Sequence, residues 1–119
     1  MKYLLLIHQG DSPTPRSPEA WATLSEDEQK AVYADYQAIN QTPGVTPGVG
    51  MQPPELATTV RVQDGRTLTT DGPFVEIKEA IGGYLHFEAD DLDAAIELAA
   101  RIPAASMGGA IEVRPIKEW

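Results

Sequence analysis

The residues from Asp71 to Phe74 combine a carboxylate with a turn that could hold it in a fixed position. Asp71 ends a segment with strand-like alternation, Gly72 permits close approach of another backbone, and Pro73 stiffens the turn. Desolvation in a cleft would make the Asp71 carboxylate a stronger base, suited to proton abstraction. The alternative is an Asx turn, in which Asp71 accepts a hydrogen bond from the amide of Phe74, because Pro73 has no N–H. The two roles do not exclude each other.

His8 and Tyr36 are the candidate partners of such a base. His8 ends the first apolar segment, and an imidazole suits proton transfer at neutral pH. We expect His8 at the rim of a cleft, the alternative being a hydrogen-bonded histidine at a strand end. In an isomerisation or elimination next to a carbonyl, Asp71 would remove the proton. His8 or Tyr36 would then donate a hydrogen bond to the developing enolate.

Further ligand contacts are expected from the same segments. The ligand-binding candidates are Tyr36, Pro73, Phe74 and Lys78. Lys78 stands in a charged stretch that also holds Glu76 and Glu79. Such a stretch could present charges to a ligand, or it could be a solvated loop, and both interpretations stay open.

The residue types argue against a metal or cofactor. The chain has no cysteine and two histidines, His8 and His86. The segment at 81–88 is expected to run antiparallel to the first strand, which places His86 towards the opposite end from His8. No closely spaced histidine pair is present, and no glycine-rich segment opens a helix in the manner of a phosphate loop. We therefore expect neither a metal nor a cofactor, and proton transfer requires none.

Charge and length restrict the class of protein and its partners. The chain has 119 residues, which predicts a single domain over 1–119. Its net charge of −9 disfavours nucleic-acid and anionic-membrane binding, because its nine basic residues are dispersed. The opening segment is too short for a signal peptide, and no apolar run would span a membrane. We expect a cytoplasmic protein whose partners are small molecules or a second copy of itself.

The apolar patterns predict two helices and several strands. Ser25 and Glu28 form a capping box before a helix over about 26–41, with Val32, Tyr36 and Ile39 on one face. A second helix begins after Asp90 or Asp91 and stops at Pro103, with the apolar stripe Leu92, Ala95, Ile96 and Ala99. Strands are expected at 2–8, near 45–51 at a sheet edge, at 58–63 and 66–70 as a hairpin around Asp64-Gly65, at 81–88 and at 110–116.

This order predicts an α+β protein with the ferredoxin-like βαββαβ plan and an inserted β-hairpin. Two helices cover only one face of a four-stranded sheet, yet the segment Tyr3–Ile7 is apolar on both alternating faces. A second copy would cover the remaining face and give a twofold dimer. The alternative is that the hairpin and the proline-rich loops fold back over it.

Short motifs in a fixed order then identify a family. They are MKYLLLI at the start, Met51-Gln52-Pro53-Pro54, Asp71-Gly72-Pro73-Phe74, Gly82-Gly83-Tyr84, Asp91-Leu92-Asp93-Ala94-Ala95, Ile102-Pro103-Ala104 and Glu112-Val113-Arg114-Pro115-Ile116. Together they resemble the YCII-related family, in the subgroup named for its Asp-Gly-Pro-Phe motif, over about residues 1–117.

The resemblance implies a dimeric α+β barrel but no established reaction. It also implies a possible association with sigma factors, beside or fused to which some members occur. Relatives in the wider family have been suggested to be enzymes with a His–Asp pair. That histidine lies in the first helix, and residues 26–41 here contain none. Tyr33 and Tyr36 are the nearest substitutes.

Two hypotheses therefore stand. In the first, a cytoplasmic homodimer binds a small, apolar or weakly polar organic molecule, with Asp71 and His8 as catalytic candidates if proton transfer occurs. In the second, the protein is a non-catalytic module, either a ligand sensor or a partner of a transcription factor, whose acidic surface suits a basic protein.

Overall fold

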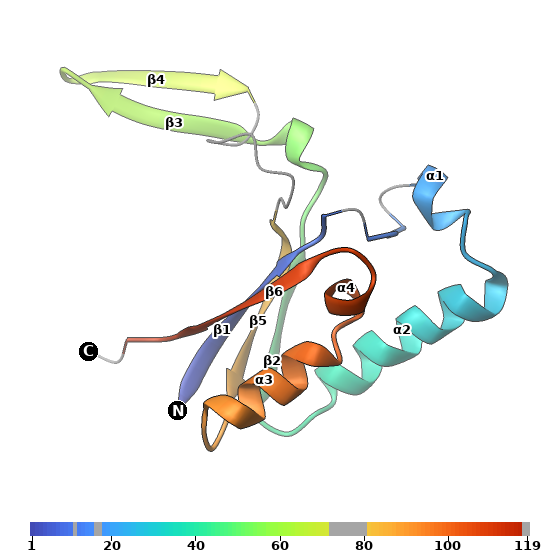
Figure 1. Ribbon diagram of the computed structural model, residues 1–119. Coiled ribbons are helices and arrows are strands. Elements are labelled where there is room, and N and C mark those ends of the chain that lie inside the picture. Colours follow the sequence, from blue (N-terminus) through green and yellow to red (C-terminus); the bar gives the residue numbers. More distant parts are fainter. Residues whose placement is uncertain (11, 16–17, 72–80, 118–119) are drawn as a thin grey trace.

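Four antiparallel strands form the main sheet of the structure, a computed structural model that describes residues 1–10, 12–15, 18–71 and 81–117. Their order is β2-β5-β1-β6. The strands are β1 (Lys2–His8), β2 (Val45–Gly50), β5 (Ile81–Glu88) and β6 (Ala110–Pro115) (Figure 1). Two longer helices connect them, α2 (Glu26–Asn40) between β1 and β2, and α3 (Leu92–Ala100) between β5 and β6. The mixed α+β architecture and this strand order are compatible with the predicted ferredoxin-like plan.

Short elements complete the described chain. The helix α1 (Pro18–Trp21) precedes α2, and α4 (Pro103–Ser106) begins at the proline that was expected to stop α3. A single 3-10 turn, η1 (Pro54–Leu56), leads into the hairpin of β3 (Thr58–Gln63) and β4 (Arg66–Asp71). None of the helices in the described residues is long and apolar enough to cross a membrane.

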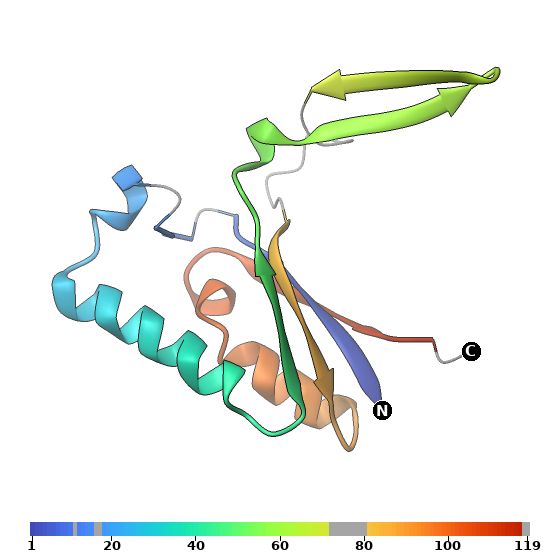
Figure 2. The same ribbon diagram turned by 180° about the vertical axis from the view of Figure 1, so that it is seen from behind.

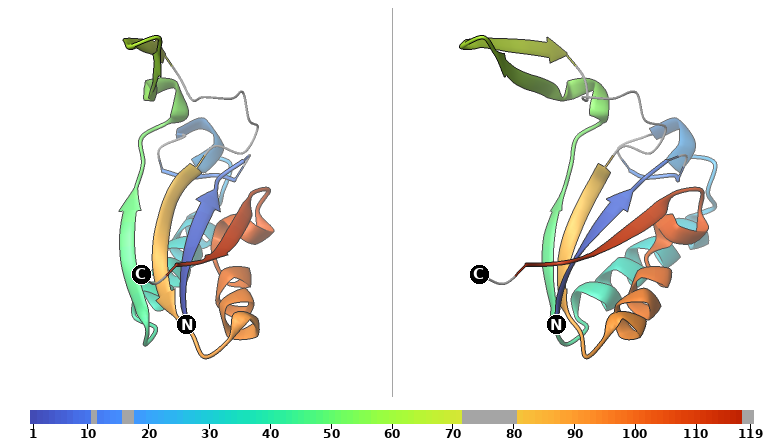
Figure 3. Two further views of the ribbon diagram at one scale, coloured as in Figure 1. Left: turned by 90° about the vertical axis from the view of Figure 1, so that its left-hand side faces the viewer. Right: turned by 60° about the vertical axis from the view of Figure 1, so that its left-hand side comes forward.

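The helices lie on one face of the main sheet, and no described segment covers the other, which we call the uncovered face (Figure 3). Alternation along β1 sends Tyr3, Leu5 and Ile7 into the core beneath the helices, where all three are buried. Leu85 and Phe87 of β5 pack with them. Leu4 and Leu6 occupy the alternate positions on the opposite face and are half-buried. β1 is therefore apolar on both sides, but only one of these sides is covered by helices.

The predicted helix starts are confirmed. The hydroxyl of Ser25 accepts a hydrogen bond from the amide of Glu28 at 3.1 Å, and the Ser25 amide donates to the Glu28 carboxylate at 3.0 Å. Hydrogen bonding of the Glu28 carboxylate by Ser25, first of all by the Ser25 backbone amide, holds the pKa of Glu28 below its ordinary value. At α3, Asp91 is the cap and accepts from the amide of Ala94 at 2.9 Å. Val32 and Ile39 of α2 are buried as the stripe predicted.

The stripe predicted for α3 was wrong in part. Ala95 and Ala99 are buried, but Leu92 and Ile96 are 49% and 51% exposed, and Leu98 is fully buried instead. The apolar sector of α3 is wider than its contact with the sheet. Burying two alanines lets the helix approach the strands closely, and Leu98 then fills the space beside them.

The hairpin of β3 and β4 forms a second, two-stranded sheet that stands away from the main sheet (Figure 2). Its turn is the predicted Asp64-Gly65 pair, and both residues have positive φ, 52° and 74°. Two consecutive positive φ angles are typical of the type I′ turn that favours this dipeptide. We call residues 58–71 the arm. The arm does not fold back over the uncovered face of the sheet.

Candidate functional site

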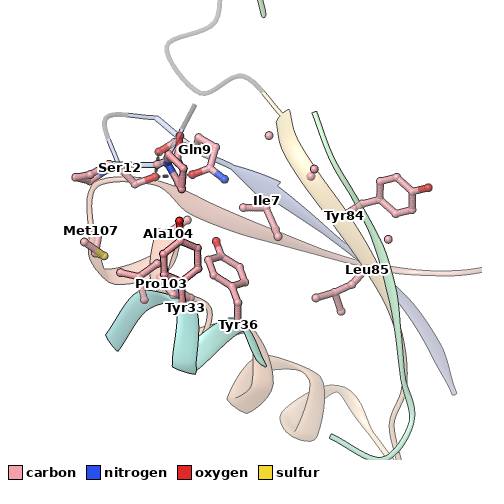
Figure 4. Close-up of a pocket in the computed structure, with 18 of the residues that line it drawn as sticks. Ile7, Gln9, Ser12, Tyr33, Tyr36, Tyr84, Leu85, Pro103, Ala104 and Met107 are labelled. Carbon is pink, nitrogen blue, oxygen red and sulfur yellow. Dashed lines mark hydrogen bonds between the residues drawn. The ribbon is translucent and has the colours of Figure 1, made fainter. Parts of the chain in front are cut away.

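A cavity of about 470 Å³ lies between the helix-covered face of the main sheet and α2 (Figure 4). Its walls come from the C-terminal half of β1, residues 12–15, α2, β2, the start of β5 and α4. The volume is within the range of about 300–1,000 Å³ that is common for small-molecule sites. It lies where the strands end and the loops begin, and its described lining includes Tyr36 but not His8.

Two tyrosines of α2 give the cavity its aromatic wall. Tyr33 and Tyr36 rise from the helix towards Gln9 and Ser12 (Figure 4). Tyr36 is half-buried and packs against the core, so its ring has a fixed position. The ring of Tyr33 meets the edge of Trp21 in α1, with ring centroids 5.5 Å apart and an interplanar angle of 72°. This contact places α1 near the helix face that lines the cavity.

A tight turn after β1 orders the polar side of the cavity. The amide of Ser12 donates to the carbonyl of Gln9 at 2.9 Å. The hydroxyl of Ser12, a buried residue, lies 2.5 Å from that carbonyl oxygen and 2.8 Å from Oε1 of the Gln9 side chain. The Gln9 side chain lies directly over Gly82, where any Cβ would overlap it. Serine and glycine therefore fix the amide of Gln9 in one position at the wall.

Gly83 leaves the floor of the cavity open. It pairs with Ile7 in the sheet, so both residues face α2. A Cβ built on Gly83 would lie 3.2 Å from the carbonyl oxygen of Val49 and 3.9 Å from Cδ1 of Ile7. An alanine would fit with a small adjustment, whereas a larger side chain would extend over Ile7 and reduce the volume.

None of the described lining residues carries a charge. They comprise aliphatic residues, tyrosines, glycines, prolines and the neutral polar residues Gln9, Ser12, Thr14 and Asn40. In a chain with a net charge of −9, a lining without charged residues indicates a site that selects neutral ligands over ionic ones. A desolvated ionic group would meet no described counter-charge there, which is costly, whereas a neutral ligand with one or two hydrogen-bonding groups would be satisfied.

His8 lies on the uncovered face of the sheet, one residue beyond Ile7 and on the opposite side from Tyr36. Its Nε2 is 3.5 Å from Oε1 of Glu112 in β6. The same carboxylate also pairs with Arg114, two residues further along β6. The structure therefore does not bring His8 and Tyr36 to one face within a single chain.

Asp71 lies at the base of the arm. It is the last residue of β4, and its backbone pairs with Thr58 of β3. The proposed ligand residues Pro73, Phe74 and Lys78 lie outside the described residues, as does the side chain of Asp71. Their assigned roles stay predictions.

The register of the sheet confirms the separation of the two histidines. Leu4 is opposite His86, and His8 is opposite Ile81 at the other end of the pairing. Among the described residues, no three acidic or histidine side chains cluster in a way that could hold a metal ion.

Sequence reasoning identified Tyr36 but missed the contribution of Gln9, Ser12 and Gly83. Gln9 and Ser12 lie between the predicted strand at 2–8 and the predicted helix at 26–41, where the sequence analysis named no element. The sequence did contain a usable signal. Side chains alternate along a strand, so Gln9, two residues after the inward-facing Ile7, is expected to face the same side as Ile7. Gly83 was noted only as part of the Gly82-Gly83-Tyr84 motif, whereas its contribution to the site is the volume that its missing side chain leaves.

Comparisons with known proteins identify the family. The family model described as YCII-related domain matches residues 1–119. An uncharacterized protein of Rhizobium meliloti (strain 1021) is 31% identical over 121 residues, covering 98% of this chain and 92% of that protein. These findings agree with the ordered motifs of the sequence. The chain belongs to the YCII-related domain family.

Proposed function

We propose that the protein binds a small, uncharged organic molecule in the cavity between the sheet and α2. The observation that carries the proposal is a cavity of about 470 Å³ whose described lining is neutral in an otherwise acidic chain. Tyr36 and the Gln9–Ser12 turn supply the polar contacts, and Ile7 and Val32 supply apolar surface. An aromatic ring bearing a carbonyl or amide matches this combination.

The experiment compares three ligands of nearly equal shape, namely benzamide, benzoate and benzylamine. Binding is followed by the amide resonances of a ¹⁵N-labelled protein during titration. We expect benzamide to shift the resonances of Ile7, Val32 and Gly83, and to bind at least about tenfold more tightly than benzoate. Equal or tighter binding of benzoate contradicts the neutral-ligand proposal. Absence of binding by all three would favour the interaction-module hypothesis.

Two tyrosine variants localise the binding. Tyr36→Phe removes a hydroxyl from the cavity. Tyr84 also borders the cavity, but its ring and hydroxyl point to the other side of the sheet, so Tyr84→Phe removes a hydroxyl outside the cavity (Figure 4). We expect Tyr36→Phe to weaken benzamide binding several-fold, about the value of one hydrogen bond, and Tyr84→Phe to leave it unchanged. Equal effects of the two substitutions would place the ligand elsewhere.

We also propose that two copies pair through the uncovered face of the sheet. Leu4, Leu6 and Tyr84 share this face, and all three are only half-buried in one chain. Pairing would remove this apolar surface from water, which is the main favourable contribution in most associations. Charged residues such as Glu112 and Arg114 on β6 would form the rim.

Sedimentation velocity tests the pairing with matched variants. Leu6→Glu introduces a charge on the uncovered face, whereas Ile96→Glu introduces the same charge on the exposed side of α3. We expect the wild type and Ile96→Glu to sediment as dimers at micromolar concentration and Leu6→Glu to sediment as a monomer with an unchanged circular dichroism spectrum. A monomeric wild type would refute the pairing.

Proton transfer by Asp71 is the chemical extension of this proposal. Acetophenone is a suitable probe, because it is neutral and has exchangeable protons next to its carbonyl. We expect the protein in D₂O to accelerate loss of the methyl proton signal, and Asp71→Asn to lower that acceleration by at least about a hundredfold. Exchange that is not accelerated by the wild type argues for binding without catalysis.

A further inference from the structure

Among the described residues, nothing packs against the arm to give it the support that a two-stranded ribbon requires. Figures 1 and 2 show it extending beyond the end of the main sheet. It makes the molecule elongated, with extents of 50 × 42 × 18 Å and a Cα radius of gyration of 16.1 Å. A compact chain of this length would have a radius of gyration of about 13.5 Å. An isolated hairpin is only marginally stable in water, so the arm needs a further packing surface.

One side of the arm has the composition of an interface. The pairs Val60–Thr69 and Val62–Thr67 are directly opposite each other, so these four residues share one side, which we call the valine face. Val60 is 59% exposed and Val62 is 68% exposed. The other side holds the polar residues Arg61, Gln63 and Arg66 together with one apolar residue, Leu68, which is 43% exposed. Alternation of this kind normally marks a strand pair that is covered on its apolar side.

The direction of the arm indicates what covers it. Figure 1 shows the arm extending to the side of the sheet that is opposite the helices. The left view of Figure 3, which looks towards that side, shows the arm foreshortened and directed at the viewer. The arm therefore projects past the uncovered face, into the space that a second copy would occupy.

Charge favours a second copy as the occupant. Residues 58–71 hold two arginines, Arg61 and Arg66, and two aspartates, Asp64 and Asp71, so the net charge of −9 belongs entirely to the rest of the chain. Most surfaces of two such copies repel each other. The arm is electrically neutral and its valine face is uncharged, so it can approach the acidic surface of another copy without that penalty.

We propose that the valine face of the arm packs against a second copy of this chain bound at the uncovered sheet face. The twofold symmetry of such a pair makes the contact reciprocal, so each copy is held by the arm of the other. This inference rests on the proposed dimer and adds a contact that the sheet face alone does not supply. The arm is then an ordered part of the interface.

The dissociation constant of the dimer tests the contact. Val62→Glu places a charge on the valine face, and Gln63→Glu places the same charge on the adjacent residue of the polar side. We expect Val62→Glu to raise the dissociation constant at least about tenfold in sedimentation equilibrium, and Gln63→Glu to change it less than about threefold. Dimers that Val62→Glu leaves as stable as the wild type overturn the arm contact while preserving the dimer.

Cross-linking between copies supplies a second readout. Because the chain has no cysteine, a single Val62→Cys substitution can carry a benzophenone maleimide at one position. The labelled chain is mixed with a ¹⁵N-labelled wild type, exchanged into mixed dimers and irradiated. We expect cross-linked peptides from the ¹⁵N chain, and far fewer from a Gln63→Cys control. Cross-links confined to the labelled chain itself, or a monomeric wild type, overturn the proposal.

Discussion

The two faces of the main sheet are built from the same strands but have different surroundings. On the covered face, Tyr3, Leu5 and Ile7 are buried beneath the helices, and Ile7 also lines the cavity. On the uncovered face, Leu4 and Leu6 are half-buried, next to Glu112, which contacts His8 and pairs with Arg114. Alternation assigns each side chain to a face, but only packing makes one face a core. The covered face gives the fold its stability, and the uncovered face has surface available for association.

Leucine-to-alanine substitutions at adjacent positions are the strongest test of this comparison. Leu5→Ala removes a fully buried side chain and should lower the free energy of unfolding by about 2–5 kcal/mol. Leu6→Ala removes a half-exposed one and should cost about 1 kcal/mol or less when the chain is monomeric. Urea unfolding at low protein concentration measures both. Equal losses would mean that the two faces do not differ as described.

The helix that covers the inner face depends on its cap. Ser25→Ala removes the hydroxyl that accepts from the Glu28 amide and should destabilise the fold by about 1 kcal/mol. Ser106→Ala is the control, because that hydroxyl makes only a 3.4 Å contact with the carbonyl of Pro103. The control should stay within about 0.5 kcal/mol of the wild type. A larger effect at Ser106 would contradict the assigned importance of the cap.

The ion pairs of the uncovered face should contribute little to the fold. Glu112→Gln removes the carboxylate shared by His8 and Arg114, and its side chain is about one-third exposed. We expect a change of about 0.5 kcal/mol or less in the monomer, because solvent screens such pairs. Thermal unfolding in low and high salt measures it. A loss comparable with that of Leu5→Ala would show that the uncovered face also stabilises the single chain.

The smallest expected effect is a pH dependence from Glu28. Its pKa in the folded protein is lowered from the ordinary value of 4.5, because Ser25 donates its backbone hydrogen bond to the carboxylate. Folding therefore favours the ionised form, and the stabilisation is present above pH 4.5 and lost as the pH falls through the lowered pKa. Glu28→Gln should flatten this part of the stability profile. An unchanged profile would show that other carboxylates account for it.

Much of the fold could be predicted from local patterns. The capping box at Ser25, the turn at Asp64-Gly65 and the edge position of β2 follow from short-range chemistry, and the structure confirms each one. The buried side of α3 was only partly predicted, because α3 has more apolar residues than its contact with the main sheet can bury. Leu98 was selected over Leu92 and Ile96 by the fit between α3 and the sheet. That fit depends on residues distant in sequence.

The candidate site was less predictable than the fold. Tyr36 was identified, because its helical position placed it beside the buried Val32 and Ile39. The cavity itself depends on the Ser12–Gln9 turn and on the absence of a side chain at Gly83. Such features have no strong local signature, since a glycine or serine in a loop has many uses. That His8 and Tyr36 lie on opposite sides of the sheet could be known only from the structure, because it depends on which face the helices cover.

The sequence by itself determined the family, the α+β class, the starts of the two longer helices and the presence of two apolar sides on β1. These depend on side-chain spacing and on capping bonds between residues three or four positions apart, which are set within one element. The tertiary structure decided which side of β1 became the core, where the cavity opened and where the arm points. Those features arise from contacts between distant segments, whose outcome depends on the volume and direction of every element packed together.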